Sequence, residues 1–269
     1  MAPEAKNTDL AYISNFYNST ILAFTYPGGK YVGSISSDDP EGECTSKTSN
    51  GNWWVVASGN DEILEYAHGG TTPLKTLNVS VGEPADCAVD PTTGNLAVTI
   101  LGAGGVVIFA AASGAGTTVA DGLSSSYFDG YDDKGDLFVD GITQSDTYGV
   151  VELPKDGSTF ETIRLSRSLE FPGKLQWHGK YLAVGDPEGV IYHFAIHGTN
   201  AKEIGVTQLT GWNGGGFWIQ DPDIVALGAG SGSIGAIWKY PAGGFPIRML
   251  QGGQSDFPIG VTVSVTKRR

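Results

Sequence analysis

Carboxylate side chains recur along this chain of 269 residues in the stretches just ahead of short apolar runs. The acidic members are Glu43, Asp86, Asp129, Glu170 and Asp256, and two aromatic residues, Phe128 and Trp212, occupy comparable stretches. Carboxylates gathered around one point repel each other, which raises their pKa values unless a cation is bound. The pattern predicts a site for a cationic or other polar ligand. The alternative is that these acids are solvated loop residues that accept hydrogen bonds from backbone amides at strand starts.

A divalent cation such as Ca²⁺ is the one cofactor that the sequence suggests, because such hard cations take several oxygen ligands. The candidate ligands are Glu43, Asn60, Asp86 and Asp186. We identify no catalytic motif. His193 and His197 are four residues apart, and on a strand they would lie roughly 13 Å apart, which excludes a zinc pair. The sequence contains no Gly-x-Ser-x-Gly elbow, the motif that would indicate a serine hydrolase.

Composition and charge restrict the partners. The net charge of -13 and a pI near 4.6 argue against nucleic-acid binding, which needs a basic face. No apolar run approaches the roughly 18 residues of a membrane span. The first eight residues are polar and carry no signal peptide, and we expect a secreted or periplasmic protein whose leader has been removed. We also expect a monomer.

A repeated hairpin predicts the elements that position these residues. A short strand, a Gly-rich turn and a returning strand occur at 20–30, 62–75 and 235–250, and looser copies occur at 105–117, 149–162 and 189–202. The residues that close the first strand of each copy are spaced by 42, 43, 44, 41 and 46 positions: Phe24, Tyr66, Phe109, Leu153, Phe194 and Tyr240. A period near 40 to 45 with several strands per unit is typical of a β-propeller.

Two further apolar runs precede each hairpin, so each unit reads as a four-stranded antiparallel blade. We predict an all-β, six-bladed propeller in a single domain, 1–269, with blades at 10–37 plus 257–265, 41–80, 83–120, 124–166, 170–210 and 213–253. The N-terminal unit lacks its first strand, and 257–265 supplies a spare one. We therefore predict that the C-terminal strand closes the ring as the innermost strand of the N-terminal blade.

Cys44 and Cys87 are equivalent, since each lies seven residues before the turn glycine of its blade, Gly51 or Gly94. On neighbouring inner strands they either form a disulfide, which requires a Cα separation within about 7 Å, or serve as small buried fillers.

The run from Pro84 to Leu96 resembles the strand–turn–strand core of an NHL repeat, and the whole chain is similar to six-bladed propellers of the NHL-repeat and gluconolactonase-like superfamily. In lactonases of that group a Glu, two Asn and an Asp hold a divalent metal. The resemblance implies Glu43 for the Glu, with Asn60 or Asp186 as partners. The Asn-Gly-Leu strand start of those lactonases is missing here.

Three functions follow from this pattern. The first is an NHL-like binding module that holds a small polar ligand, glycan or peptide on the acidic channel face. The second is a metal-dependent, lactonase-like hydrolase with a divalent cation at the central channel. The third is a purely structural or protein-docking propeller.

Overall fold

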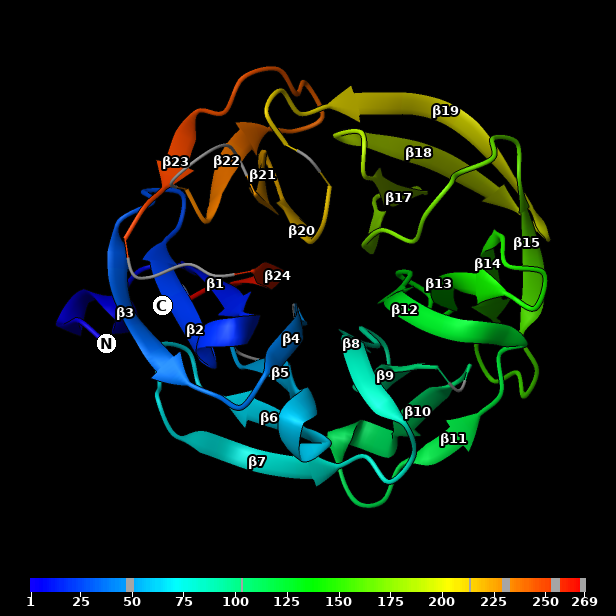
Figure 1. Cartoon of the computed structure of the whole chain (residues 1–269), viewed down its shortest axis with the longest axis horizontal. Helices are drawn as coiled ribbons and strands as arrows, with labels where there is room; N and C mark the ends of the chain where they lie inside the picture. The colour runs from blue at the N-terminus through cyan, green and yellow to red at the C-terminus, as the bar shows by residue number, and fades with distance from the viewer. Residues whose placement is uncertain (47–50, 103, 213, 229–232, 253–256, 267–269) are drawn as a thin grey trace.

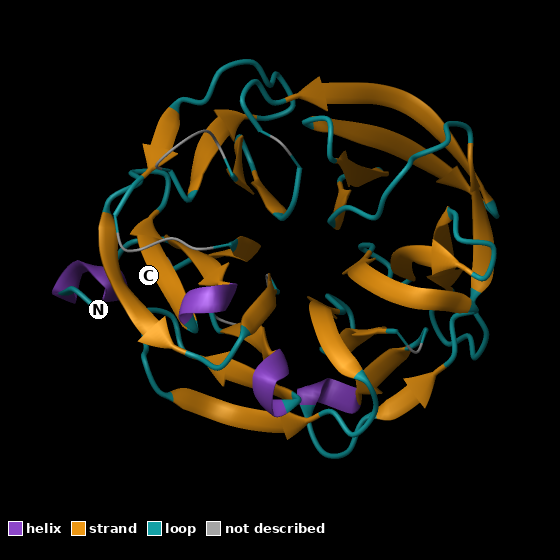
Figure 2. Cartoon of the chain, in the orientation of Figure 1, coloured by secondary structure: helices purple, strands orange, loops and turns teal. Residues whose placement is uncertain are grey.

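The computed structural model describes residues 1–46, 51–102, 104–212, 214–228, 233–252 and 257–266. The described residues form 24 strands, and Figure 2 shows only short helical turns between them. These turns are the 3₁₀ helices η1 (Pro3–Lys6), η2 (Phe16–Asn18), η3 (Ser58–Asn60) and η4 (Ala110–Ala112). None of the described helices is long and apolar enough to cross a membrane.

The sheets stand radially around one axis (Figure 1). Four of them have four antiparallel strands each. In order from the axis outward they are β24 (Pro258–Ser264), β1 (Leu10–Asn15), β2 (Thr20–Thr25) and β3 (Tyr31–Ser36); β4 (Pro40–Thr45), β5 (Trp53–Ala57), β6 (Glu62–Tyr66) and β7 (Pro73–Asn78); β8 (Glu83–Val89), β9 (Leu96–Leu101), β10 (Val106–Phe109) and β11 (Thr117–Val119); and β20 (Phe217–Gln220), β21 (Asp223–Leu227), β22 (Gly235–Lys239) and β23 (Arg248–Leu250).

The fifth sheet has eight strands. Its order is β12 (Leu123–Tyr131), β13 (Leu137–Thr143), β14 (Tyr148–Leu153), β15 (Glu161–Leu165), β19 (Asn200–Gln208), β18 (Val190–His197), β17 (Tyr181–Asp186) and β16 (Leu175–His178). Two antiparallel halves are joined where β15 and β19 run parallel and pair Arg164 with Asn200 and Leu165 with Ala201. The architecture is that of a β-propeller, as the sequence predicts, but the predicted separation into six four-stranded sheets is interrupted here.

The C-terminal strand joins the N-terminal sheet, as predicted. β24 pairs with β1 in antiparallel fashion, with Leu10 opposite Ser264 and Ala11 opposite Val263. Val261 and Val263 are buried in a cluster that also holds Ile13 and, from the neighbouring sheet, Ile237. Apolar contact between the first and last parts of the chain therefore closes the ring.

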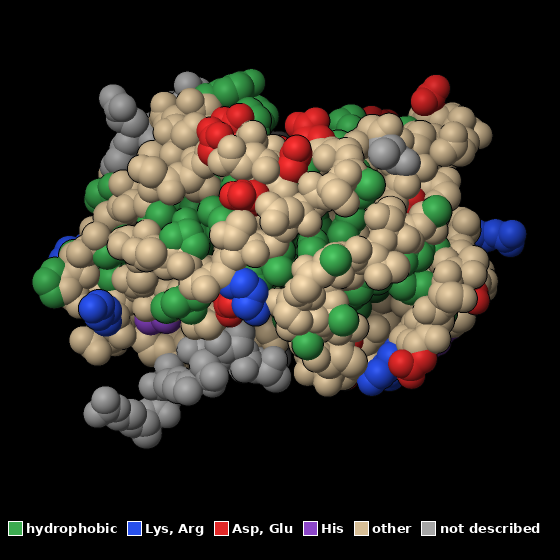
Figure 3. Space-filling model, turned by 90° about the horizontal axis from the view of Figure 1, so that it is seen from below, with side chains coloured by type: hydrophobic (Ala, Val, Ile, Leu, Met, Phe, Trp, Pro, Cys, Tyr) green, Lys and Arg blue, Asp and Glu red, His purple; other side chains and the backbone are tan. Residues whose placement is uncertain are grey.

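The strands nearest the axis are β24, β4, β8, β12, β16 and β20, and they all run in the same direction along the axis. We call the face at which these inner strands begin the upper face, and the face at which they end the lower face. Seen from the side, acidic side chains gather along one edge of the ring, the edge of the face that Figure 1 turns to the viewer (Figure 3).

Three inner strands extend over the stretches that carry the acids: β4 begins at Pro40, β8 at Glu83 and β12 at Leu123. The inner strands β24, β4 and β8 are in close backbone contact near the axis. A Cβ at Gly42 would lie 2.5 Å from the Asp86 Cα, and one at Gly260 would lie 2.0 Å from the Glu41 carbonyl oxygen. Glycine lets β24, β4 and β8 approach this closely. The acids that we expected in loops here are therefore strand residues, which is a correction.

Cys44 on β4 and Cys87 on β8 form a disulfide, with their Cα atoms 5.6 Å apart. This resolves the alternative that the sequence left open. The bridge joins two inner strands that belong to different sheets and closes a loop with a sequence separation of 43 residues.

Replacing both cysteines by alanine is expected to lower the free energy of unfolding by about 2–4 kcal/mol, because the bridge limits the freedom of the unfolded chain. Urea denaturation of the variant and of the reduced wild-type protein measures the effect, and the two should agree. Unchanged unfolding midpoints would show that the bridge does not contribute to stability.

Candidate functional site

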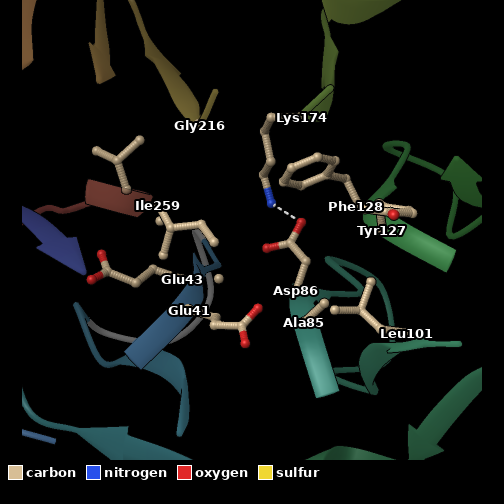
Figure 4. Close-up of a pocket in the computed structure, with 13 residues that line it drawn as sticks. Glu41, Glu43, Ala85, Asp86, Leu101, Tyr127, Phe128, Lys174, Gly216 and Ile259 are labelled. Atoms are coloured by element: carbon tan, nitrogen blue, oxygen red, sulfur yellow. Dashed lines mark hydrogen bonds and ion pairs between the residues drawn. The ribbon is translucent and has the colours of Figure 1, made fainter. Parts of the chain in front are cut away.

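The candidate site is a hollow of about 110 Å³ where the inner strands begin, which we call the upper cavity. Its polar side chains come from different sheets, with Glu41 and Glu43 on β4, Asp86 on β8 and Lys174 just ahead of β16. Figure 4 shows Lys174 and Asp86 pointing toward one another, while the Glu43 carboxylate points away from this pair, toward Ser14 on β1. Apolar lining comes from Ala85, Leu101, Tyr127, Phe128, Ile259 and Val261.

An ion pair lies at the floor of this cavity. The Lys174 Nζ is 2.5 Å from the Asp86 Oδ2, and the two side chains are only 6% and 2% exposed. The same Oδ2 atom also accepts a hydrogen bond from the Asp129 amide at 3.3 Å. Burial raises the pKa of Asp86, and the Lys174 charge opposes this shift. A buried pair of this kind ties its two strands together and penalises the loss of either partner.

Glu43 is completely enclosed. Its Oε1 accepts a hydrogen bond of 2.7 Å from the Ser14 hydroxyl, while its Oε2 has no hydrogen-bond partner among the described residues. Burial raises the pKa of Glu43 well above its ordinary value, and the bond from Ser14 and the charge of Lys174 only partly oppose that rise. In its protonated form this carboxyl group can donate as well as accept a hydrogen bond.

Glu41 lies nearer the opening, and its carboxylate points into the hollow (Figure 4). Its burial raises the pKa to about 7; Ser58 opposes the rise, and repulsion from Glu83 and Asp86 adds to it. A carboxyl group with this pKa changes charge near neutrality. It is therefore the group of the upper cavity that a bound cation would most readily ionise.

The Glu41 carboxyl predicts a pH effect on stability. Its folded pKa lies above the ordinary 4.5, so the stability present at low pH is lost as the pH rises from about 4.5 through 7. Glu41→Gln is therefore expected to raise the free energy of unfolding at pH 8 by about 2–3 kcal/mol and to have little effect near pH 4. Thermal unfolding of both proteins between pH 4 and 8 measures it. A constant difference between them across this range would contradict the shifted pKa.

Two more buried carboxyl groups lie behind the ion pair. Asp140 on β13 accepts hydrogen bonds of 3.1 Å from the amides of Phe128 and Gly173, one at each oxygen. Asp129 on β12 has no partner for either oxygen among the described residues. Burial raises both pKa values well above normal. For Asp129, repulsion from Asp86 adds to the rise.

The structure separates the predicted ligand-binding residues into groups. Glu43, Asp86 and Phe128 line the upper cavity together. Asp129 is adjacent but faces a second cavity below. Glu170 is exposed. Trp212 is 4% exposed and packs edge-on against Phe217 in the core, and Asp256 lies outside the described residues.

The predicted metal ligands are only partly brought together. Glu43 and Asp86 share the upper cavity, whereas Asn60 is an exposed residue of η3 and Asp186 ends β17, where its Oδ1 accepts the Glu188 amide at 2.9 Å. In the described part of the chain, no group of three or more His, Cys, Asp or Glu side chains is arranged to hold a metal ion.

Two functional positions were not predicted from the sequence. Lys174 lies just ahead of an inner strand, where other repeats carry acids. That exception to the repeat was the signal for its pairing with Asp86. Asp140 follows an apolar run in a second strand and carries no comparable signal.

Aromatic side chains stand around the upper face. Phe16 and Tyr17 of η2 contact Phe257, which directly precedes β24, with ring centroids 5.3 to 6.4 Å apart. Tyr17 is 65% exposed and Phe257 is 54% exposed. A second pair, Tyr127 and Phe171, packs edge to face, with ring centroids 6.0 Å apart. We call these five residues the aromatic rim.

Comparison with known proteins supports the architecture. No family model matches the sequence, and no curated protein matches it. The fold is similar to a chain in a solved structure described as "Crystal structure of Nidogen/Laminin Complex", with a TM-score of 0.74 over 97% of this chain and 100% of that one, at 10% sequence identity. At this identity the similarity shows the fold alone: the protein is a β-propeller.

Proposed function

We propose that this protein is an NHL-like binding module whose upper face holds a peptide or a loop of a partner protein. The observation that carries the proposal is the upper cavity itself, a small hollow lined by buried carboxyl groups at the centre of a face that exposes large aromatic side chains. Exposed aromatic groups around a central hollow are typical of protein interaction surfaces.

The size of the hollow favours a peptide over the other ligands that the sequence suggests. Sites for small molecules usually enclose about 300–1,000 Å³, whereas the upper cavity has about 110 Å³. This volume suits one inserted side chain, and Glu41, Glu43 and Asp86 outnumber the single lysine that lines it. A Lys, Arg or amide side chain would supply the hydrogen-bond donors that these oxygens accept.

The architecture is consistent with this role. We count the ring as six blades, since the parallel contact within the eight-stranded sheet involves only two residue pairs between its outer strands. The nidogen/laminin chain of similar fold comes from a complex between proteins. Disulfides are typical of exported proteins, and the Cys44–Cys87 bridge therefore agrees with the expectation of a secreted or periplasmic location.

A peptide-display selection on the immobilised protein tests the proposal. Enriched peptides should carry a basic or amide side chain next to an apolar one. Tyr17→Ser is expected to weaken their binding by about ten-fold or more, whereas Phe245→Ser, which removes an aromatic residue that is 79% exposed in the turn after β22, should leave it unchanged. The proposal fails if no sequence is enriched, or if both substitutions have equal effects.

A divalent cation at the channel, and with it lactonase-like hydrolysis, remains an alternative that rests on Glu43 and Asp86 alone. If Ca²⁺ binds there, excess Ca²⁺ should raise the unfolding temperature, because a ligand of the native state stabilises it. Glu43→Gln should abolish that rise. An unchanged unfolding temperature in Ca²⁺, Mn²⁺ and Zn²⁺ would exclude this alternative.

A further inference from the structure

A second and larger cavity of about 500 Å³ opens where the inner strands end, and we call it the lower cavity. Its volume falls within the range of small-molecule sites. Lys174 lines both cavities, so the Asp86–Lys174 pair lies between them. The lower cavity is therefore separate from the proposed peptide site.

Asp129 gives the lower cavity an unusual polar group. It lines the cavity, its side chain is 1% exposed, and neither of its oxygens has a hydrogen-bond partner among the described residues. Buried carboxylates normally have such partners. The carboxyl group is enclosed beside the cavity, and a ligand donor that reached it would supply the hydrogen-bond partner that it lacks.

The charges around the cavity favour a cation. The ionisable side chains that line it, apart from tyrosine, are Asp129, Asp132, Asp133 and Lys174. Lys174 is paired with Asp86 at 2.5 Å, so its charge is largely compensated. Asp132 is also committed, because its Oδ1 accepts backbone amides of the following turn. Asp133 is exposed, so Asp129 remains as the buried carboxyl group of this set.

Aromatic walls supply apolar contact for the rest of such a ligand. Trp177, Trp218 and Tyr131 line the cavity. Trp177 is held in place by stacking on Phe138, with the ring planes 8° apart. The Gln176 side-chain amide accepts a hydrogen bond from the Ile219 amide at 2.7 Å and donates one to the Ile219 carbonyl at 3.0 Å, which fixes β16 against β20. Indole and phenol rings attract organic cations through their π faces.

We propose that the lower cavity binds a small organic amine, whose ammonium group pairs with Asp129 and whose apolar part lies against Trp177 and Trp218. The three features that carry this inference are a cavity of ligand size, a buried carboxyl group without a partner, and aromatic walls. Nothing in it depends on the peptide site at the upper face.

Binding of phenethylamine to the full-length protein, measured by isothermal titration calorimetry and ligand-detected NMR, tests the proposal. Phenethyl alcohol is the matched neutral probe. We expect saturable binding of the amine and binding of the alcohol that is at least about ten-fold weaker, since a hydrogen bond to a charged group accounts for such a difference. Burial raises the pKa of Asp129, repulsion from Asp86 and Asp140 adds to the rise, and the charge of Lys174 opposes it. Amine affinity should therefore rise with pH, because ionised Asp129 pairs more strongly with the ammonium group.

Two substitutions make the test specific. Asp129→Asn removes the charge at a site without intramolecular partners, so the protein should still fold, and it should weaken amine binding about ten-fold or more. Glu170→Gln removes an exposed acid that lines neither cavity and should leave binding unchanged. Equal affinities for the amine and the alcohol, unchanged affinity in Asp129→Asn, or no saturable binding of the amine would each overturn the proposal.

Discussion

Lys174→Met is expected to lower the free energy of unfolding by about 3–5 kcal/mol at neutral pH. The substitution keeps an apolar stem of similar length but removes the cation that pairs with Asp86. The Asp86 side chain is only 2% exposed, so its carboxylate would be enclosed without a counter-charge. Protonation of Asp86 limits the loss, and burial already raises the pKa of that carboxyl. The destabilisation should therefore be largest near pH 8 and smaller near pH 5. Urea denaturation at both pH values measures it.

The double variant Lys174→Met with Asp86→Asn is the matched control. A buried pair often contributes little net stability compared with uncharged residues of similar size, so the double variant should recover most of the loss. Lys180→Met, which changes an exposed lysine in the turn between β16 and β17, should have little effect. A Lys174→Met variant as stable as wild type at both pH values would mean that Asp86 carries no charge in the folded protein.

The repeated hairpins explain why the architecture could be predicted. Each strand-turn-strand unit is a local structure, with its turn chemistry and apolar alternation written in consecutive residues. The equivalence of Cys44 and Cys87 within this repeat placed them on adjacent inner strands, which the disulfide confirms. The C-terminal strand was also predictable, because the first unit visibly lacked a strand that 257–265 could supply.

The environment of each site residue was harder to predict, because it depends on contacts between strands of different sheets. From the sequence, Glu41, Glu43 and Asp86 resemble loop acids. In the structure they lie on β4 and β8, where Gly42 and Gly260 allow three backbones to come close together. The pairing of Asp86 with Lys174 spans 88 residues. A local sequence pattern cannot predict a contact between residues so far apart in the chain. Only the position of Lys174 within the repeat indicated this pairing.

The environment of Trp212 was also not predictable from the sequence. Its position ahead of an inner strand suggested a ligand contact, yet the ring is buried against Phe217. The direction of a side chain at the start of a strand depends on the neighbouring sheet, here through Gly185, whose missing Cβ leaves room for the indole. The parallel contact of β15 with β19 is likewise a tertiary contact between two hairpins rather than a property of either one.

Removal of 253–269 is expected to abolish cooperative folding. This deletion takes away β24, and with it the inner partner of β1 and the buried side chains of Val261 and Val263. Burial of a valine contributes roughly 1.5–3 kcal/mol, and a typical domain is stable by only about 5–15 kcal/mol. The loss of two valines and of the β1 pairing therefore approaches the whole stability. Circular dichroism during thermal unfolding should show no sharp transition in the shortened chain.

A circular permutant separates loss of the strand from loss of its position in the chain. Because Leu10 pairs with Ser264, the first and the last strand of the chain already lie side by side. A chain that begins at 253, with a short Gly-Ser linker between 269 and 1, retains every residue and makes β24 and β1 consecutive. It should unfold cooperatively near the wild-type temperature, since strand pairing and not chain order closes the ring. A shortened chain as stable as the wild type would show instead that the remaining sheets hold the ring together without β24.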